Sequence, residues 1–241
     1  MKKSALILLA ILLVSSTSCI IGGWDNHITG NGNVVEEIRD ISGFTGVHLS
    51  SGIDVLLSEG KDFEVRVEAD ENLLEVITTE LKGDILVVGT DRVNIHNARA
   101  KRVHVTLPEL KTLKVTSAGD CEGQTLFHCE DLDLDITSAG DLTLEVKADR
   151  IDVNIRSSGD VRLSGKTDVL HASLSSAGDL QAFDLVAGEV DVDVSSAGDA
   201  RVYATDEISM NVSSAGNIYY KGGARVIRSS RSSAGDIIKK D

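Results

Sequence analysis

Carboxylate and hydroxyl side chains recur at a regular spacing in the second half of the chain. A peptide close to Ser-Ala-Gly-Asp occurs seven times between residues 117 and 236, and its glycines lie 18 to 21 residues apart. Carboxylates bind calcium in proteins and supply the acid and base of polysaccharide cleavage. The repeated positions are Ser117, Gly119, Asp120, Ser138, Gly140, Asp141, Ser157, Gly159, Asp160, Ser176, Gly178, Asp179, Ser196, Gly198, Asp199, Ser214, Gly216, Asn217, Ser233, Gly235 and Asp236.

The aspartate column has to satisfy a physical constraint. Like charges about 4.8 Å apart, the spacing of neighbouring strands, repel by roughly 0.9 kcal/mol in water. The column must therefore be solvated, bonded to amide groups at the corners, or neutralised by cations. We expect each aspartate to cap its own turn, as this residue often does. A calcium-binding ladder and a catalytic acid are the alternatives. Acids that recur in every coil are, however, typical of a structural repeat, whereas an active site needs a cluster at one place on the rod.

The other reactive side chains show no arrangement typical of a catalytic or metal site. None of the six histidines is paired with another ligand at metal-site spacing, and no G-x-S-x-G motif is present. Cys121 and Cys129 either form a disulfide, which an oxidising compartment permits, or are two small buried residues. The net charge of −14 argues against nucleic acid as a partner. We expect no metal and no cofactor, with calcium as the alternative.

The residues on both sides of each corner alternate with period two. Ile151, Val153 and Ile155 precede Ser157 with polar residues between them, and apolar residues resume two and four places after each glycine. This alternation is typical of strands that turn one face toward a core. Each period then consists of a strand, a tight corner, a strand and a loop. Units of this length that stack on one another predict an all-β fold, a parallel β-helix (solenoid) with coils of about 19 residues.

The corner itself requires small residues, because successive backbones pass close to one another there. Glycine lacks a Cβ atom and also permits a positive φ. We expect the serines to form an inward column in which each hydroxyl reaches a hydroxyl or carbonyl of the neighbouring coil.

The outward positions after the corner form a second column. Arg162 and Arg201 each stand three places past a glycine, with Gln181 between them and Tyr219 at the same position in a later coil. A glycan or peptide ligand would fit along this stripe, and ordinary solvated side chains are the alternative.

The two ends of the repeat region differ from its middle. Residues 46–60 resemble a degenerate unit with Ser50, Gly52 and Asp54 near its corner, residues 62–70 alternate, and a turn is expected at 82–84. These segments are expected to begin the solenoid or to cover its first end. In the last coil, Ile227, Ser229 and Arg231 take positions that are apolar elsewhere, which is typical of a terminal cap.

The first residues have the composition of an export signal. Lys2 and Lys3 precede an apolar run over residues 5–14, and small residues lead to Cys19. The run is too short to span a bilayer. We interpret residues 1–18 as a lipoprotein signal peptide, Cys19 as the lipidated residue, 19–29 as a lipidated tether and 30–241 as a single β-helix domain, with regular repeats over 117–236. A soluble secreted form is the alternative.

Residues 30–60, the sequence LKGDILVVGT at 81–90 and the Ser-Ala-Gly-Asp ladder together resemble the putative auto-transporter adhesin, head GIN domain family of Bacteroidetes lipoproteins. The resemblance covers about residues 30–238. It implies a right-handed parallel β-helix in the cell envelope, and it supplies no catalytic residues.

These observations favour a non-enzymatic cell-envelope lipoprotein that serves as an adhesin, scaffold or binding protein. Its expected partners are a membrane, through the lipid anchor, and an envelope glycan or protein. We expect it on the outer membrane, facing either the periplasm or the surface. A carbohydrate-active enzyme that cleaves polysaccharides with ladder aspartates is the second hypothesis, and a periplasmic sensor is the third.

Overall fold

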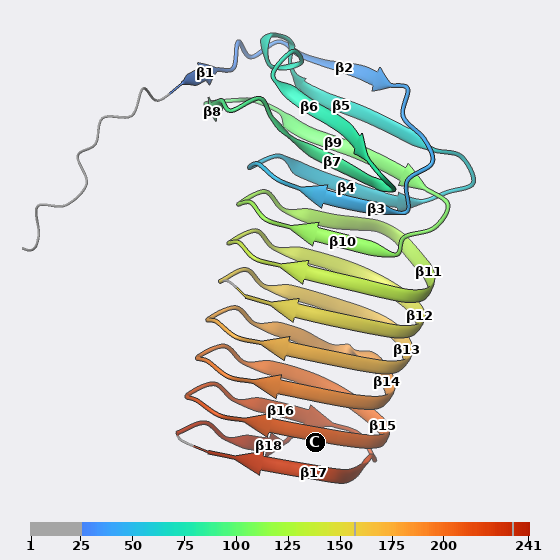
Figure 1. Ribbon diagram of the computed structural model, residues 1–241, viewed down its shortest axis with the longest axis vertical. Coiled ribbons are helices and arrows are strands. Elements are labelled where there is room, and N and C mark those ends of the chain that lie inside the picture. The colour runs from blue at the N-terminus through green and yellow to red at the C-terminus, as the bar shows by residue number, and fades with distance from the viewer. Residues whose placement is uncertain (1–25, 157, 233) are drawn as a thin grey trace, which may run out of the picture.

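The computed structural model describes residues 26–156, 158–232 and 234–241. Three residues named above, Cys19, Ser157 and Ser233, lie outside the described residues, as does the signal segment. The protein is a parallel β-helix, a rod of stacked coils with a flat sheet on each side (Figure 1). The expected all-β solenoid with coils of about 19 residues is confirmed.

The regular coils occupy residues 112–239. Each coil has one tight corner, made by the repeated peptide, and a second bend that lies inside a continuous strand, so most strands are long and wrap from one sheet to the other (Figure 1). The strands are β10 (Thr112–Val115), β11 (Cys121–Ile136), β12 (Leu142–Ile155), β13 (Val161–Leu174), β14 (Leu180–Val194), β15 (Ala200–Val212), β16 (Ile218–Lys221), β17 (Arg225–Arg231) and β18 (Ile237–Lys239).

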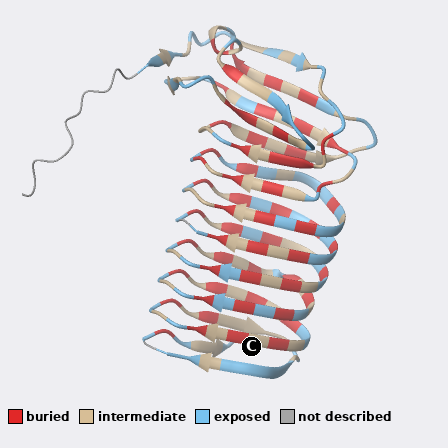
Figure 2. Cartoon of the chain, in the orientation of Figure 1, coloured by how far each residue is buried: buried red, intermediate tan, exposed pale blue. Residues whose placement is uncertain are grey.

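The core is a set of aliphatic columns that run along the rod. Equivalent residues pair in register from coil to coil, as Leu142 does with Val161 and Val161 with Leu180. All three are fully buried, and buried and exposed residues alternate along the strands (Figure 2). The apolar residues of the period-two pattern therefore form the inward face of each coil. They pack against the opposite sheet and against the equivalent residues of the neighbouring coils.

The corner glycines are stacked as closely as backbones allow. A Cβ atom added to Gly140, Gly159, Gly198 or Gly216 would lie closer than 3.0 Å to the carbonyl oxygen of the preceding glycine in the column. None of the repeat glycines has a positive φ; Gly165 at a second bend does. Of the two properties of glycine named above, the missing Cβ atom is therefore the one that the corners use, and the tolerance of positive φ is not.

The N-terminal half both begins the solenoid and covers its end. Its strands are β1 (His27–Thr29), β2 (Val34–Arg39), β3 (Gly46–Leu49), β4 (Asp54–Glu59), β5 (Glu64–Asp70), β6 (Ile77–Lys82), β7 (Ile85–Thr90), β8 (Asn94–His96) and β9 (Lys101–Leu107), with a short 3-10 helix, η1 (Glu71–Leu73). The coil made by β3 and β4 lies between the β10–β11 coil and a later coil made by β7 and β9. Strands β2, β5 and β6 then add in antiparallel fashion and close this end.

The N-terminal segment is held by a buried carboxylate that sequence reasoning missed. Asp70 is fully buried, and its two oxygens accept hydrogen bonds from the backbone N–H groups of Gly32 at 2.8 Å, Arg99 at 3.0 Å and Ala100 at 3.1 Å. Nearby, β1 pairs with β8, so residues 27–29 of the expected tether are part of a two-stranded sheet. Asp70 thus ties the start of the domain to the loop before β9.

The C-terminal coil ends the rod with charge. Strand β17 pairs with β15 and is largely exposed, and it carries Arg225, Arg228 and Arg231. The pairing skips Ile227, so Val226 and not Ile227 lies opposite Ile208. The interpretation of Ile227 as the equivalent of a core residue is therefore wrong by one position, because a register shift follows Val226. Arginines at an exposed edge disfavour pairing with another sheet.

We predict that Gly198→Ala destabilises the protein by at least about 2 kcal/mol, since the new methyl group would meet the Gly178 carbonyl oxygen. Gly223→Ala is the matched control, because a Cβ atom there has nothing within 4 Å. Urea unfolding followed by circular dichroism measures both. Equal midpoints for the two variants would contradict the close packing of the corners.

We predict that acid loosens the N-terminal end through Asp70. Burial alone would raise the pKa of this carboxyl, but the three backbone N–H groups outweigh burial and hold its pKa below the ordinary value of 3.8. A lowered folded pKa means that the stabilisation is present above pH 3.8 and is lost as the pH falls through the folded pKa. The protection of the amides of residues 30–33, measured relative to the intrinsic exchange rate at each pH, should fall over that range in the wild type. A pH profile unchanged by Asp70→Asn would contradict this role.

Candidate functional site

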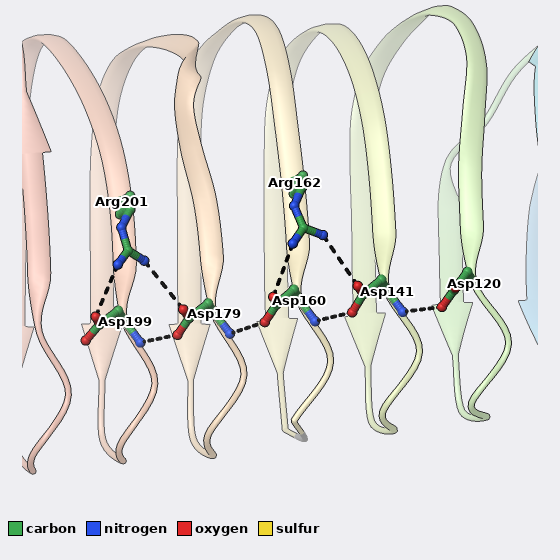
Figure 3. Close-up of polar contacts among 7 residues, drawn as sticks. All are labelled: Asp120, Asp141, Asp160, Arg162, Asp179, Asp199 and Arg201. Carbon is green, nitrogen blue, oxygen red and sulfur yellow. Dashed lines mark hydrogen bonds and ion pairs between the residues drawn. The ribbon is translucent and has the colours of Figure 1, made fainter.

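The aspartates of the repeat form one hydrogen-bonded ladder along the rod (Figure 3). The carboxylate Oδ1 of each aspartate accepts the backbone N–H of the aspartate in the next coil. The distances from donor nitrogen to Oδ1 are 3.0 Å from Asp141 to Asp120, 3.0 Å from Asp160 to Asp141, 3.2 Å from Asp179 to Asp160 and 2.7 Å from Asp199 to Asp179. The expectation that each aspartate caps its own turn is therefore wrong; each one caps the turn of its neighbour.

The backbone explains why a carboxylate is needed at this position. The residue after each aspartate donates its N–H to the carbonyl of the next aspartate, as Cys121 does to Asp141 and Leu142 to Asp160. The aspartate N–H, one residue earlier, bonds instead to the side chain of the preceding coil. The carboxylate oxygen thus extends the ladder of strand hydrogen bonds by one rung into the corner.

The ladder continues beyond the regular repeat at both ends. Asp54 in the degenerate coil accepts the N–H of Asp120 at 3.2 Å, so Asp54 is the first member. Asn217 replaces aspartate near the other end, and its Oδ1 accepts the N–H of Asp236 at 3.0 Å. The side-chain amide of Asn217 also donates to Asp199 Oδ1 at 2.9 Å. Asparagine is therefore compatible with the ladder, because an amide oxygen accepts the same bond.

Two arginines of the expected ligand stripe bind the ladder. Arg162 reaches Oδ2 of Asp141 at 3.4 Å and of Asp160 at 3.3 Å (Figure 3). Arg201 reaches Oδ2 of Asp179 at 3.5 Å and of Asp199 at 3.4 Å. Each guanidinium therefore spans two coils, and it uses the carboxylate oxygen that the backbone N–H leaves free.

The stripe occupies one line of register. Arg162 pairs with Gln181, Gln181 with Arg201, and Arg201 with Tyr219. The guanidinium carbon of Arg201 also lies 5.0 Å from the centre of the Tyr219 ring. The two cations of the stripe thus have partners within the protein, which reduces what they can offer to a ligand.

The serine column uses carbonyl partners. The hydroxyl of Ser138 donates to the Ser117 carbonyl, and that of Ser196 donates to the Ser176 carbonyl. The N–H of Gly216 donates to the Ser196 carbonyl at 2.7 Å. Serine and glycine of successive corners are therefore bonded in the same direction as the aspartates.

Cys121 and Cys129 are free thiols, so the structure does not contain the disulfide that was one of the two alternatives. Cys121 begins β11 and is buried; Cys129 is half-buried near the second bend. Burial raises the pKa of Cys121, and burial together with Glu59 and Glu109 raises that of Cys129 to about 12. Both are therefore protonated at neutral pH and poor nucleophiles.

Within the part of the chain that the structure describes, no group of three or more His, Cys, Asp or Glu side chains is placed to hold a metal ion. In the same residues, no helix has the length and apolar character needed to cross a membrane. The ladder carboxylates hold corners together in this arrangement.

At the C-terminal end of the aspartate-bearing sheet, Arg201 and Tyr219 of the expected stripe join further aromatic and basic residues that sequence reasoning missed. The Lys221 ammonium lies 4.5 Å from the centre of the Phe183 ring, and Lys240 lies 4.9 Å from that of Tyr219. Tyr203 of β15 pairs with Lys221 of β16 in the sheet. We call Phe183, Arg201, Tyr203, Tyr219, Lys221 and Lys240 the aromatic–basic surface. Outward positions of three successive coils could have indicated it, but the bulge after Ala182 displaces Phe183 from the regular spacing.

We predict that Asp160→Ala destabilises the protein by about 1 to 3 kcal/mol, because it leaves the Asp179 N–H without an acceptor. Asp160→Asn should lose less than half as much, since its amide oxygen can still accept this bond, as that of Asn217 does. Asp184→Ala, at an exposed aspartate with no bond among the described residues, is the control. Equal stability of the Ala and Asn variants in urea unfolding would refute the capping role.

The chain was compared with known families and structures. The family model of the putative auto-transporter adhesin, head GIN domain, matches residues 43–224. A putative adhesin from Bacteroides fragilis NCTC 9343 is 20% identical with a TM-score of 0.83, over 88% of this chain and 100% of its own. A putative adhesin from Parabacteroides merdae ATCC 43184 is 20% identical with a TM-score of 0.72, over 90% of this chain and 100% of its own.

A third solved structure, a putative lipid binding protein from Parabacteroides distasonis ATCC 8503, is 22% identical with a TM-score of 0.74, over 90% of this chain and 100% of its own. The TM-scores of these three structures show that they share the fold of this chain. No curated protein matches the chain. The family model covers most of the sequence, and the ladder from Asp54 to Asn217 lies inside the matched region. The chain therefore belongs to the putative auto-transporter adhesin, head GIN domain family.

Proposed function

We propose that the protein is a non-enzymatic lipoprotein of the cell envelope, anchored in the outer membrane through Cys19, that binds an envelope glycan or protein with the outer walls of its β-helix. The export signal and the small residues before Cys19 support the anchor. Membership in a family of putative adhesins supports a binding role. Loss of palmitate labelling in a Cys19→Ala chain tests the anchor.

One observation carries the non-enzymatic part of the proposal. Along the described ladder, each aspartate from Asp120 to Asp199 accepts a backbone N–H at Oδ1. Four of these aspartates also form an ion pair with an arginine through Oδ2. A glycosidase needs a pair of carboxyl groups whose surroundings differ, so that one is protonated and the other is not. Ladder carboxylates share the same surroundings, and protonating one would weaken a corner.

The aromatic–basic surface is the part of the wall that best fits a binding role. Three of the four cation–π contacts found among the described residues lie on this surface, on Phe183 and Tyr219. These contacts fix the Lys221 and Lys240 ammonium groups on a protein whose net charge is −14. Fixed cations of this kind favour an acidic ligand, and an acidic envelope glycan has the required charge and an extended shape.

We predict that the purified full chain cleaves no polysaccharide of an acidic and neutral panel, with or without calcium, because its ladder carboxylates are structural. Assays for new reducing ends and for unsaturated products measure cleavage. Retention on immobilised acidic glycans measures binding, which should fall at least about fivefold in Lys221→Ala if the surface acts as proposed. Lys166→Ala, at a second bend, is the control.

Cleavage that is abolished by Asp160→Asn or Asp179→Asn in a protein of unchanged stability would overturn the proposal in favour of the enzyme. Equal retention of the Lys221→Ala variant and the wild type would remove the aromatic–basic surface as the contact.

A further inference from the structure

A pocket of about 820 Å³ opens at the N-terminal end of the rod, beside the corner that precedes Asp54 and at the opposite end from the aromatic–basic surface. Its walls are the first corner, residues 50–53, the segment 92–96 with Thr90, and Lys101. Binding sites for small molecules have volumes of about 300 to 1,000 Å³. The pocket therefore has room for a small ligand or a headgroup.

The pocket exists because the repeat is interrupted there. In the regular coils each corner is covered by the next, with glycine against a carbonyl oxygen. Above the β3–β4 corner, the chain leaves β7 at Thr90 and returns only at Lys101 in β9, and the intervening residues form β8, which pairs with β1. The first corner is thus left open on one side, and the loop is its second wall. A hollow made by breaking a repeat is specific to one place on the rod.

The charges of the pocket are opposite to those of the protein. Two arginine or lysine side chains, Arg92 and Lys101, and His96 line it, and none of its lining residues is acidic. Among the described residues, the Arg92 guanidinium has no hydrogen-bond or ion-pair partner. The Lys101 ammonium donates to the Gly52 carbonyl, which fixes it at the wall and leaves two further protons. In a chain of net charge −14, this lining favours an anion.

The wall also holds hydroxyl groups in fixed positions. Ser51 Oγ accepts the Thr90 N–H at 3.0 Å, so its proton can turn toward a ligand. Thr90 Oγ1 donates to the Val93 carbonyl at 3.0 Å, which closes the turn that carries Arg92. Arg92 itself has φ of 52°, a conformation that non-glycine residues adopt rarely and that clusters at functional sites. The loop therefore presents Arg92 from a defined backbone.

We propose that this pocket binds a phosphate group. A guanidinium binds phosphate with two parallel hydrogen bonds, an ammonium adds a point charge, and the Ser51 hydroxyl can donate a further bond, whereas that of Ser50 donates to the Val88 carbonyl. The phosphate belongs to a lipid headgroup or to a small soluble phosphate ester. Cys19 precedes β1 by eight residues, which span at most about 28 Å. An anchored protein would hold the pocket near the membrane, which favours the headgroup; this choice of source rests on the anchor proposed above, whereas the phosphate site does not.

The test uses the full chain with Cys19→Ser, which removes the acylation site and keeps every described residue. Glycerol 3-phosphate and inorganic phosphate are titrated by calorimetry, and flotation is measured with phosphatidylcholine vesicles that contain or lack phosphatidylglycerol. We expect saturable binding of glycerol 3-phosphate that weakens at least about tenfold in Arg92→Gln. Arg228→Gln, the same change at an exposed arginine of the other end, should bind as the parent does.

The vesicle arm separates the two sources. Flotation with phosphatidylglycerol that glycerol 3-phosphate competes away supports the headgroup, and binding of soluble phosphates alone supports a soluble ester. Lys101→Met is a second variant, expected to weaken binding. Because Lys101 also bonds to the Gly52 carbonyl of the corner, the Arg92→Gln variant is the decisive test of the site. Absence of saturable binding of either phosphate, or unchanged affinity in Arg92→Gln, overturns the site. Neither result bears on adhesion or on the lack of cleavage.

Discussion

The structure depends on how closely successive corners can approach. A parallel sheet sets neighbouring strands about 4.8 Å apart, and here that spacing continues through a bend in the chain. At the glycine of each corner the space that a Cβ atom would take belongs to a carbonyl oxygen of the coil before it. The column therefore accepts only glycine, and every other repeated residue is positioned relative to it. The serine two places earlier bonds to the preceding corner, and the aspartate one place later bonds to the following one.

The repeated aspartates follow from the same geometry. A strand ladder would leave one N–H per corner without a backbone acceptor, and the aspartate Oδ1 of the neighbouring coil takes that place. Repulsion along the column is offset because each carboxylate accepts an N–H, and Arg162 and Arg201 each pair with two carboxylates. A row of acids with similar surroundings does not supply what acid–base catalysis needs, which is neighbouring groups with different pKa values. Features that break the repeat, such as the pocket beside Arg92 and the aromatic–basic surface, are where specific binding can arise.

Much of this fold could be predicted from sequence, because the same structural unit is repeated along the rod and its sequence pattern therefore occurs seven times. The alternation around Val153 and the recurring glycine are sufficient to predict strands, corners and coils. The partner of Asp160 could not be predicted, because capping its own turn and capping the next one require the same residue type. The placement of the β3–β4 coil between two later coils depends on pairings distant in sequence. Asp70 and Arg92 occur once each, so no period marks them, and only the fold brings them to their partners.

Hydrogen exchange along the aspartate ladder tests the central claim most directly. The backbone N–H groups of Asp141, Asp160, Asp179 and Asp199 lie at corners with partly exposed side chains, yet each donates to a carboxylate of the preceding coil. The account predicts that these amides exchange as slowly as those of the core residues that follow them, such as Leu142 and Val161. Exchange at the rate of exposed loop amides would show that the carboxylates do not hold the corners, and would contradict the account.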